Sequence, residues 1–326
     1  MSTHVVGFEG PLSVRQFKGG QSNPTYLLEA RSGKYVLRRK PPGKLLQSAH
    51  AVDREFRVIS ALYAAGFPVP KPYAYCAAEE VVGTAFFIMG FVEGRIFWNL
   101  DLPDESPAET AAIYDQVNQT IADLHNLDYA NIGLADFGRP GNYFARQISR
   151  WSRQYLASEI GKIDAMDRLM AWLPEHIPHD DSATVVHGDF RMDNLIIHPR
   201  EPRVIAVLDW ELSTIGHPLG DFMYHLMAWQ MPEIGIGSTG LKGKDLQRLG
   251  VPGEEDYVRL YCERTGRPGI DNRSFYSAYN FFRLAAILQG IAGRVRDGTA
   301  ASAHAEKAAN AVAPLAEIGW CFAESL

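Results

Sequence analysis

The amino-acid sequence predicts a mixed α+β fold in which the strands come first and the helices follow. Short β-rich runs, separated by glycine and proline turns, fill residues 12–39 and 67–92. From about residue 107 onward, long segments carry apolar residues at helical spacing. No internal repeat or low-complexity linker divides the 326 residues, so we expect the two parts to form a single unit.

Composition limits the class of protein. With 46% hydrophobic residues, the chain can form a large core or two lobes. A net charge of −6 argues against a dedicated nucleic-acid binder. The longest apolar stretch, around AFFIMGFV, is too short to cross a bilayer, so we expect no membrane partner. Three scattered cysteines, and no signal pattern at the N-terminus, predict a cytoplasmic location.

The most informative stretch is VVHGDFRMDNLIIHP, which VIAVLDWE follows closely. Three β-rich runs separated by short polar turns place Asp189, Asn194 and Asp209 at neighbouring strand ends. Two carboxylates and one amide suit a hard cation such as Mg²⁺, which leaves room for phosphate oxygens. An Asp-rich turn in an ordinary α/β domain is the alternative, because Asp and Asn favour turns.

The spacing of these three residues matches a kinase catalytic loop and the metal-binding Asp that follows it. With its His-Gly-Asp start, the loop resembles the aminoglycoside phosphotransferase and choline kinase branch of the protein-kinase-like fold. The resemblance implies two lobes. Residues 1–94 would form a small nucleotide-binding lobe, an antiparallel sheet with one helix. Residues 95–326 would form a larger, mainly helical lobe for catalysis and substrate binding.

The first two predicted strands are joined by the turn GGQSNPT. This turn lacks a full Walker or G-x-G-x-x-G pattern, so by itself it is best interpreted as an ordinary hairpin turn. In kinase-like proteins, however, the loop at this position covers the phosphates with backbone N–H groups, and glycines allow a close approach. The resemblance therefore makes Gly20, Ser22 and Asn23 candidates for binding the nucleotide.

The strand YVLRR places Arg38 where the kinase pattern V-A-I-K has its Lys. Arginine keeps the charge and adds a bidentate fork for phosphate or carboxylate. A helix follows from about Val52 to Ala65, and it carries Glu55 as the expected partner of Arg38. We expect its buried face to consist of Val52, Phe56, Ile59 and Tyr63. The alternatives are a solvated edge-strand arginine and a surface glutamate.

The strand TAFFIMGFVEG ends in an apolar tetrapeptide and a glycine turn. In a two-lobed kinase-like protein this segment would be the hinge, where backbone groups meet the nucleotide base. Met89, Phe91 and Val92 are therefore candidates for nucleotide binding. The same pattern also describes a simple buried strand.

The resemblance assigns a role to each polar residue of the central stretch. Asp189 would act as general base on the acceptor hydroxyl, and Arg191 would meet the γ-phosphate. Asn194 and Asp209 would hold Mg²⁺. His187 would fix the loop, and Asp221 would brace the loop backbone.

The chain also spells Asp-Phe-Gly at 136–138, a tempting metal motif. It precedes the catalytic loop and lies in a Gly/Pro-rich turn, and no strand delivers it. We interpret it as a decoy.

Longer strings, among them VLRRKPPGKLL and FFRLAAILQGIAGR, are similar to the phosphotransferase-like domain fused to some acyl-CoA dehydrogenases. This similarity implies transfer of the γ-phosphate of ATP or GTP to a hydroxyl of a small molecule, either a hydroxyacyl-CoA or a hydroxy acid. Arginines near the C-terminus agree, since a polycationic aminoglycoside would favour an acidic wall. They are Arg283, Arg294 and Arg296.

Other functions stay open. An aminoglycoside or choline-type kinase would use the same machinery on another acceptor. A nucleotide-binding pseudokinase would have no turnover. A protein kinase is disfavoured, because the segment after Asp209 has no obvious A-P-E stretch.

Overall fold

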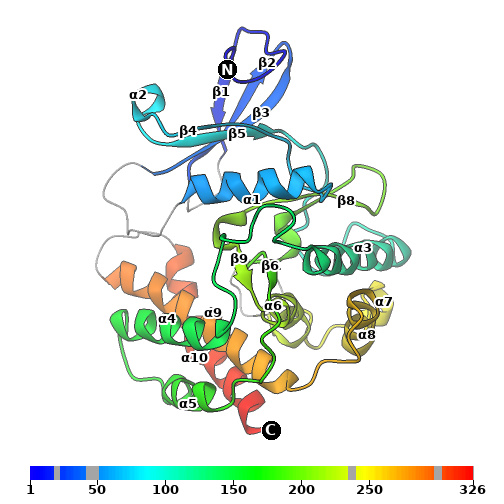
Figure 1. Ribbon diagram of the computed structural model, residues 1–326. Coiled ribbons are helices and arrows are strands. Elements are labelled where there is room, and N and C mark those ends of the chain that lie inside the picture. Colours follow the sequence, from blue (N-terminus) through cyan, green and yellow to red (C-terminus); the bar gives the residue numbers. More distant parts are fainter. Residues whose placement is uncertain (18–22, 42–50, 234–239, 297–302, 326) are drawn as a thin grey trace.

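The computed structural model describes residues 1–17, 23–41, 51–233, 240–296 and 303–325. An antiparallel sheet forms the first part of the chain, and helices dominate the rest (Figure 1). The predicted α+β fold is therefore confirmed. The strands of the sheet are β1 (Ser13–Gln16), β2 (Thr25–Ala30), β3 (Gly33–Arg39), β4 (Pro72–Cys76) and β5 (Phe86–Gly90). Their order is β1-β2-β3-β5-β4.

The two faces of this sheet bury different sets of residues. Alternation along β3 and β5 sends Val36 and Phe87 into the main core, whereas Tyr35 and Ile88 join a smaller cluster on the other face. The N-terminal segment covers that second face through Val5, which is 1% exposed. Because both faces of the sheet are covered, β3 holds the residues at its end in fixed positions.

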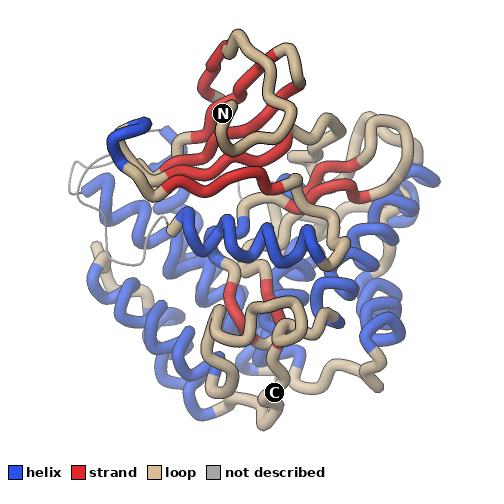
Figure 2. The backbone as a smooth tube through the Cα atoms, turned by 45° about the horizontal axis from the view of Figure 1, so that its top comes forward, coloured by secondary structure: helices blue, strands red, loops and turns tan. Residues whose placement is uncertain are grey.

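Helix α1 (Val52–Ala64) runs beneath the sheet (Figure 2). Its buried residues are Val52, Glu55, Val58, Ile59 and Leu62. The expected buried face was therefore partly wrong, since Tyr63 is 44% exposed and Glu55 is buried. The helix packs against β4, β5 and the segment at Trp210, and this turns the side that carries Glu55 inward.

The helical part is built on eight further α-helices of the described residues. They are α3 (Pro107–Asn126), α4 (Tyr143–Ala157), α5 (Asp164–Trp172), α6 (Pro218–Gln230), α7 (Leu246–Leu249), α8 (Glu254–Thr265), α9 (Arg273–Arg296) and α10 (Ala303–Glu324). A further short helix, α2 (Glu79–Val82), belongs to the sheet part. Helices α3 to α10 agree with the helical spacing of apolar residues predicted from about residue 107 onward. Helices α9 and α10 pack along each other and, with α4 and α5, form the far end of the molecule (Figure 1).

Helix α3 begins as its sequence predicts, but its capping box is only half formed. The backbone N–H of Glu109 donates to the Ser106 hydroxyl, which satisfies the helix start. The Glu109 carboxylate binds Arg95 instead of returning to the cap. An ion pair with a distant residue therefore replaces the second half of the box.

Four short strands lie between the sheet and the helices. They are β6 (Thr184–Val186), β7 (Leu195–Ile197), β8 (Val204–Val207) and β9 (Thr214–Gly216). They form two antiparallel ladders, β6 with β9 and β7 with β8. The three β-rich runs predicted around the polar turns are thus confirmed.

The segment after β5 is fastened to the β7–β8 ladder. Arg95 and Ile197 exchange two backbone hydrogen bonds, of 2.7 and 2.8 Å. A Cβ on Gly94 would lie 2.3 Å from the Ile197 carbonyl oxygen, so only glycine allows this approach. The chain therefore crosses from the sheet to the helical part directly beside the residues that follow Asn194.

One main hydrophobic cluster runs through both parts of the molecule. It joins Val36 and Phe87 of the sheet with Trp210 and the helices below. Among the described residues, no helix has the length and apolar character needed to cross a membrane.

Candidate active site

The polar turn after β6 depends on a glycine. Gly188 has a φ of +84°, and a Cβ there would lie 2.7 Å from the Leu212 carbonyl oxygen. A side chain would be both strained and obstructed at this position. The glycine thus lets the loop of Asp189 pass close to η3 (Trp210–Leu212), which follows Asp209.

A buried carboxylate braces this loop. Asp221 of α6 accepts hydrogen bonds from the backbone N–H groups of His187 at 2.7 Å and Gly188 at 2.8 Å. His125 lies 3.4 Å away on the other side. Burial would raise the pKa of Asp221, but the contacts with His125 and His187 outweigh it and hold the pKa below its ordinary value. The predicted bracing role of Asp221 is confirmed.

His187 links the two polar loops. Its Nδ1 accepts from the backbone N–H of Asp189 at 3.1 Å, so its Nε2 is the atom that donates to the Leu208 carbonyl at 2.8 Å. The backbone N–H of Leu208 donates in turn to the Asn194 carbonyl at 2.8 Å. These hydrogen bonds therefore fix the positions of Asp189, Asn194 and Asp209 relative to one another.

The carboxylate of Asp189 lies at the centre of a small polar network. Its Oδ1 accepts a 2.7 Å hydrogen bond from the Tyr224 hydroxyl and lies 3.1 Å from Arg191 Nε. Its Oδ2 accepts from Asn194 Nδ2 at 3.3 Å. The Asp189 side chain is 21% exposed, so a substrate can reach it. The structure thus brings together three residues that the sequence singled out: Asp189, Arg191 and Asn194.

Asp209 has a backbone conformation that is rare outside glycine, with a φ of +64°. Strained residues of this kind cluster at functional sites. Its side chain is 35% exposed, and Oδ1 lies 2.5 Å from Arg38 Nη2. The end of β3 therefore meets the end of β8 across the two parts of the chain.

Arg38 is surrounded by three carboxylates. Besides Asp209, it pairs with Glu55 and with Glu211, each at 3.1 Å. Burial opposes the charge of Arg38, but the three acids outweigh it and raise its pKa. Asn23 donates to Glu211 at 3.3 Å and joins this cluster. The Arg38–Glu55 pair predicted from the strand and helix order is present.

Glu55 is 2% exposed, and its environment favours the neutral acid. Burial raises the pKa of Glu55 to about 8, with Asp209 and Glu211 adding to the effect and Arg38 opposing it. Arg38 thus faces three acidic side chains. The net negative charge of this cluster favours the binding of an added cation.

The remaining candidates are less well defined by contacts. Met89 is the second-last residue of β5 and is 8% exposed, and Phe91 and Val92 come directly after the strand with half-buried side chains. The backbone N–H of Phe91 donates to the Lys34 carbonyl at 3.2 Å. Gly20 and Ser22 lie outside the described residues, so their expected role in binding the nucleotide stays a prediction.

The Asp-Phe-Gly motif lies elsewhere, against helix α1. Asp136 pairs with Arg57 on the surface, and the Phe137 carbonyl accepts from Arg54 at 2.7 Å. Arg54 also stacks on the Phe137 ring, 4.2 Å from its centroid. These contacts give the motif a structural role, in line with its interpretation as a decoy.

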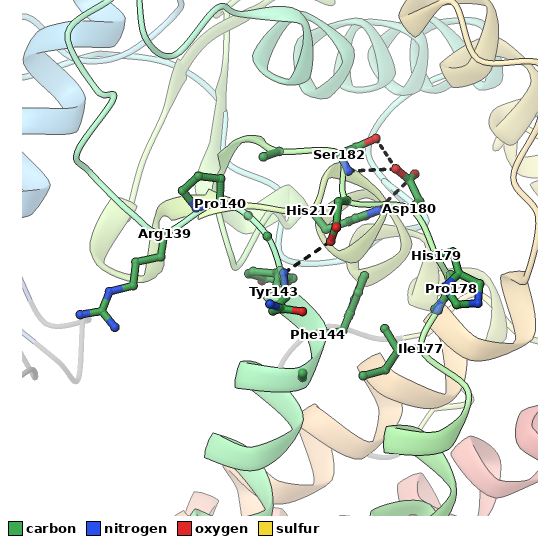
Figure 3. Close-up of a pocket in the computed structure, with 16 residues that line it drawn as sticks. Arg139, Pro140, Tyr143, Phe144, Ile177, Pro178, His179, Asp180, Ser182 and His217 are labelled. Atoms are coloured by element: carbon green, nitrogen blue, oxygen red, sulfur yellow. Dashed lines mark hydrogen bonds and ion pairs between the residues drawn. The ribbon is translucent and has the colours of Figure 1, made fainter.

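A cavity of about 330 Å³, lined by polar and apolar side chains, lies at the opposite end of the β6–β9 ladder from Asp189 (Figure 3). The start of α4 and residues 177–183 line it. Buried His217 lies 3.2 Å from Asp180 through Nε2, and its Nδ1 accepts from Leu219. Burial lowers the pKa of His217 to about 4, so the ring is neutral at pH 7. Asp180 accepts from the backbone N–H of Ser182 at 2.9 Å, whereas His217 Nε2 makes no hydrogen bond within the described residues and meets Asp180 only as a close contact.

Sequence reasoning missed two residues of the site, Glu211 and Tyr224, and it named Arg283 only as one of three C-terminal arginines that disfavour a polycationic acceptor. Glu211 stands two positions after Asp209 in VLDWE, and its proximity in the chain is a signal that could have been used. Tyr224 and Arg283 are 35 and 95 residues from their partners in the catalytic loop, and no local pattern marks them. Only the packing of α6 and α9 brings them to the site.

With this geometry established, the chain can be compared with known proteins. Residues 13–236 match the phosphotransferase enzyme family known as APH. The chain belongs to this family. The match covers the sheet, both ladders and the site residues from Asn23 to Tyr224, but not Arg283.

Similarity to curated proteins extends over nearly the whole chain. Acyl-CoA dehydrogenase family member 10 of Mus musculus is 45% identical over 323 residues, which is 99% of this chain and 30% of that protein. Family member 11 of Rattus norvegicus is 45% identical over 329 residues, 98% of this chain and 42% of that protein. The chain thus spans less than half the length of these relatives.

Solved structures share the fold. A putative aminoglycoside phosphotransferase from Ralstonia eutropha JMP134 is 53% identical, with a TM-score of 0.92, and covers 100% of this chain and 96% of its own. A choline kinase from Cryptosporidium parvum Iowa II is 14% identical, with a TM-score of 0.65, and covers 99% and 94%. The first is a relative in sequence, and the second supports the kinase-like fold alone.

Proposed function

We propose that this protein is a Mg²⁺-dependent phosphotransferase that moves the γ-phosphate of ATP or GTP to a hydroxyl of a small hydroxyacyl compound. The observation that carries the proposal is the convergence of Asp189, Asn194 and Asp209 with Arg38. These residues come from two parts of the chain, yet one connected set of contacts links them. A pseudokinase needs no such complete set, so this geometry favours turnover.

Each residue has a chemical role under this proposal. Asp189 takes the proton of the acceptor hydroxyl, and its 21% exposure leaves it within reach. Arg191 and Arg38 neutralise charge on the transferred group and the remaining phosphates. The Arg191 side chain is 40% exposed, which allows it to turn from Asp189 to the γ-phosphate.

The donor set near Asp209 fits magnesium. An amide oxygen of Asn194 and a carboxylate of Asp209 are hard ligands, and Mg²⁺ takes few of these from the protein. The amide nitrogen of Asn194 donates to the Asp189 carbonyl oxygen at 2.9 Å, which leaves its amide oxygen for another partner. When bound, Mg²⁺ neutralises the charge of the phosphate oxygens.

Nucleotide binding is assigned to the sheet part, with residues 1–94 as the nucleotide lobe and 95–326 as the catalytic and acceptor lobe. Asn23, Arg38 and Glu55 would act on the phosphates, and the backbone near Met89 would meet the base. The three cysteines are free thiols, which supports the expected cytoplasmic location.

The acceptor proposal rests on the relatives and on charge. The curated relatives that match nearly the whole chain carry the name acyl-CoA dehydrogenase, which points to acyl chemistry. Helices α6 and α9 present Tyr224 and the buried cation Arg283 behind Asp189. A cation there suits a neutral or anionic acceptor better than a polycation.

The test is Mg²⁺-dependent transfer from ATP and GTP to a panel of hydroxyacyl-CoAs, hydroxy acids, choline and aminoglycosides. We expect transfer to hydroxyacyl compounds and its loss when Mg²⁺ is chelated. Asp189→Asn should abolish turnover and leave nucleotide binding intact. Asp136→Asn is the matched control, since it changes the decoy carboxylate in the same way and should keep activity.

Three outcomes would contradict parts of the proposal. Near-full turnover by Asp189→Asn would make the base assignment wrong. Transfer to aminoglycosides alone would overturn the acceptor and agree with the name given to the Ralstonia eutropha relative. Nucleotide binding without transfer to any compound would favour a pseudokinase.

A further inference from the structure

The two oxygens of the Asp189 carboxylate have different surroundings. Oδ1 accepts a hydrogen bond from the Tyr224 hydroxyl at 2.7 Å and forms an ion pair with Arg191, whose Nε lies 3.1 Å away. In the described part of the chain, Oδ2 has one longer contact, with Asn194 Nδ2 at 3.3 Å. A carboxylate oxygen offers about two acceptor positions. Oδ1, with a short hydrogen bond and an adjacent guanidinium, is the more crowded oxygen, and Oδ2 keeps a position for an incoming hydroxyl.

The two groups that contact Oδ1 are held to different degrees. Arg191 is 40% exposed and also pairs with Asp193, so its long side chain can turn toward another anion. Tyr224 is 7% exposed and stands on α6, three residues after Asp221. Residues three apart share one helix face, so the same face holds both the backbone and the carboxylate of the loop. Tyr224 is the donor that stays when Arg191 moves.

Arg283 of α9 supports Tyr224 from the other side. Its guanidinium lies 4.8 Å from the centroid of the Tyr224 ring, and it is 5% exposed. It also donates to the carbonyl of Gly188, the residue before Asp189. The ring of Tyr224 is thus fixed between a buried cation and the carboxylate that its hydroxyl binds.

We propose that Tyr224 is a positioning residue that holds Asp189 by Oδ1 and leaves Oδ2 to act on the acceptor. This inference rests on the phosphotransferase function proposed above. In the reaction, the acceptor hydroxyl gives its proton to Oδ2 while its oxygen bonds to the γ-phosphorus. The bond from that phosphorus to the β–γ bridging oxygen breaks, and the nucleoside diphosphate leaves with that oxygen.

The test is Tyr224→Phe, which removes the hydroxyl and keeps the buried ring beneath Arg283. Without the hydrogen bond the carboxylate can rotate, and misplacement of a reacting group costs about a hundredfold in rate. We expect kcat for phosphate transfer to fall about tenfold to a hundredfold. The nucleotide KM should stay within about twofold, because Tyr224 contacts the carboxylate of the base and not the Arg38 cluster.

Tyr155→Phe is the matched control. Tyr155 is a fully buried tyrosine of α4, and it also loses a hydroxyl without losing its ring. Its kcat should equal that of the wild type. Thermal unfolding of both variants, measured beside the kinetics, reports whether each remains folded.

Each outcome decides the matter. A lower kcat for Tyr224→Phe alone, at unchanged nucleotide KM, supports the inference. Equal kcat for Tyr224→Phe and wild type, or an equal loss in both variants, overturns the inference and leaves the proposed function standing. A wild type that transfers phosphate to no acceptor overturns the proposed function and the inference with it.

Discussion

Two groups of polar residues in this molecule are arranged in opposite ways. One is the loop bed, formed by Asp221 and His187 beneath the loop of Asp189, and the other is the cluster around Arg38. Beneath the loop, Asp221 satisfies two backbone N–H groups, and His187 binds a backbone carbonyl. Around Arg38, one guanidinium meets three carboxylates through ion pairs. The loop bed comes from the helical part alone, whereas the Arg38 cluster joins the sheet to the helical part.

This difference predicts that the loop bed contributes mainly to stability, whereas the Arg38 cluster contributes mainly to ligand binding. The hydrogen bonds of the loop bed are buried and matched one to one, so the loop has its shape before any ligand arrives. The Arg38 cluster has more acids than cations, so a metal ion and a phosphate group would change its balance of charge. Changes to the bed should therefore affect folding, and changes to the cluster should affect nucleotide binding.

The largest effect is expected from Asp221→Ala. It leaves two buried backbone N–H groups without an acceptor, which should lower the free energy of unfolding by about 3–5 kcal/mol. Urea denaturation measures this loss. Asp245→Ala is the control, since Asp245 caps α7 through a single N–H of Arg248 and should cost about 1 kcal/mol. Equal losses in both variants would show that the two hydrogen bonds of Asp221 contribute no more to the free energy of unfolding than a single surface cap does.

Arg38→Met should act mainly on the nucleotide. We expect its KM to rise about tenfold to a hundredfold, since the phosphate-clamping charge is lost. Stability should also fall, because Glu55 stays buried without its partner. The double variant Arg38→Met/Glu55→Met should recover stability, because a buried pair can be replaced by apolar residues, but it should not recover the nucleotide KM. Recovery of both would mean that Arg38 has no direct role in binding.

A buried histidine beside the loop of Asp189 makes the free energy of unfolding depend on pH. His225 of α6 is 5% exposed and packs on Phe190, and burial lowers the pKa of His225 to about 4. The unfolded chain therefore takes up a proton first as pH falls below about 6.5, which favours unfolding. We expect a loss of about 2 kcal/mol in unfolding free energy between pH 7 and pH 5 from this group. Denaturation at both pH values measures it, and His225→Gln should reduce the dependence without removing it, since buried His217 also has a pKa of about 4.

The smallest effect is expected from Glu211→Gln. Glu211 is one of three acids on Arg38 and also accepts from Asn23, so its loss loosens the contact between the sheet and the helical part. The nucleotide KM should change several-fold, and the unfolding free energy by less than about 1 kcal/mol. Steady-state kinetics and denaturation together test this. A stability loss as large as that of Asp221→Ala would remove the contrast between the two regions.

The sequence by itself determined the elements and the order of the site. Period-two and period-3.6 patterns are local, so they predicted the sheet, the helix that starts at Val52 and the helical character of the chain from about residue 107. The string from His187 to Asp209 placed its polar residues at strand ends, because short strands and turns leave little freedom between them. Arg38 and Glu55 followed from the order of strand and helix.

Only the tertiary structure decided which distant side chains complete the site. Tyr224 and Arg283 reach the catalytic loop because α6 and α9 pack beneath it, and that packing depends on many apolar contacts at once. The packing of α1 against β4, β5 and η3 likewise turned Glu55 inward and Tyr63 outward, against the expected stripe. A local period tells which residues share a face, but the neighbours that meet this face are set by the rest of the chain.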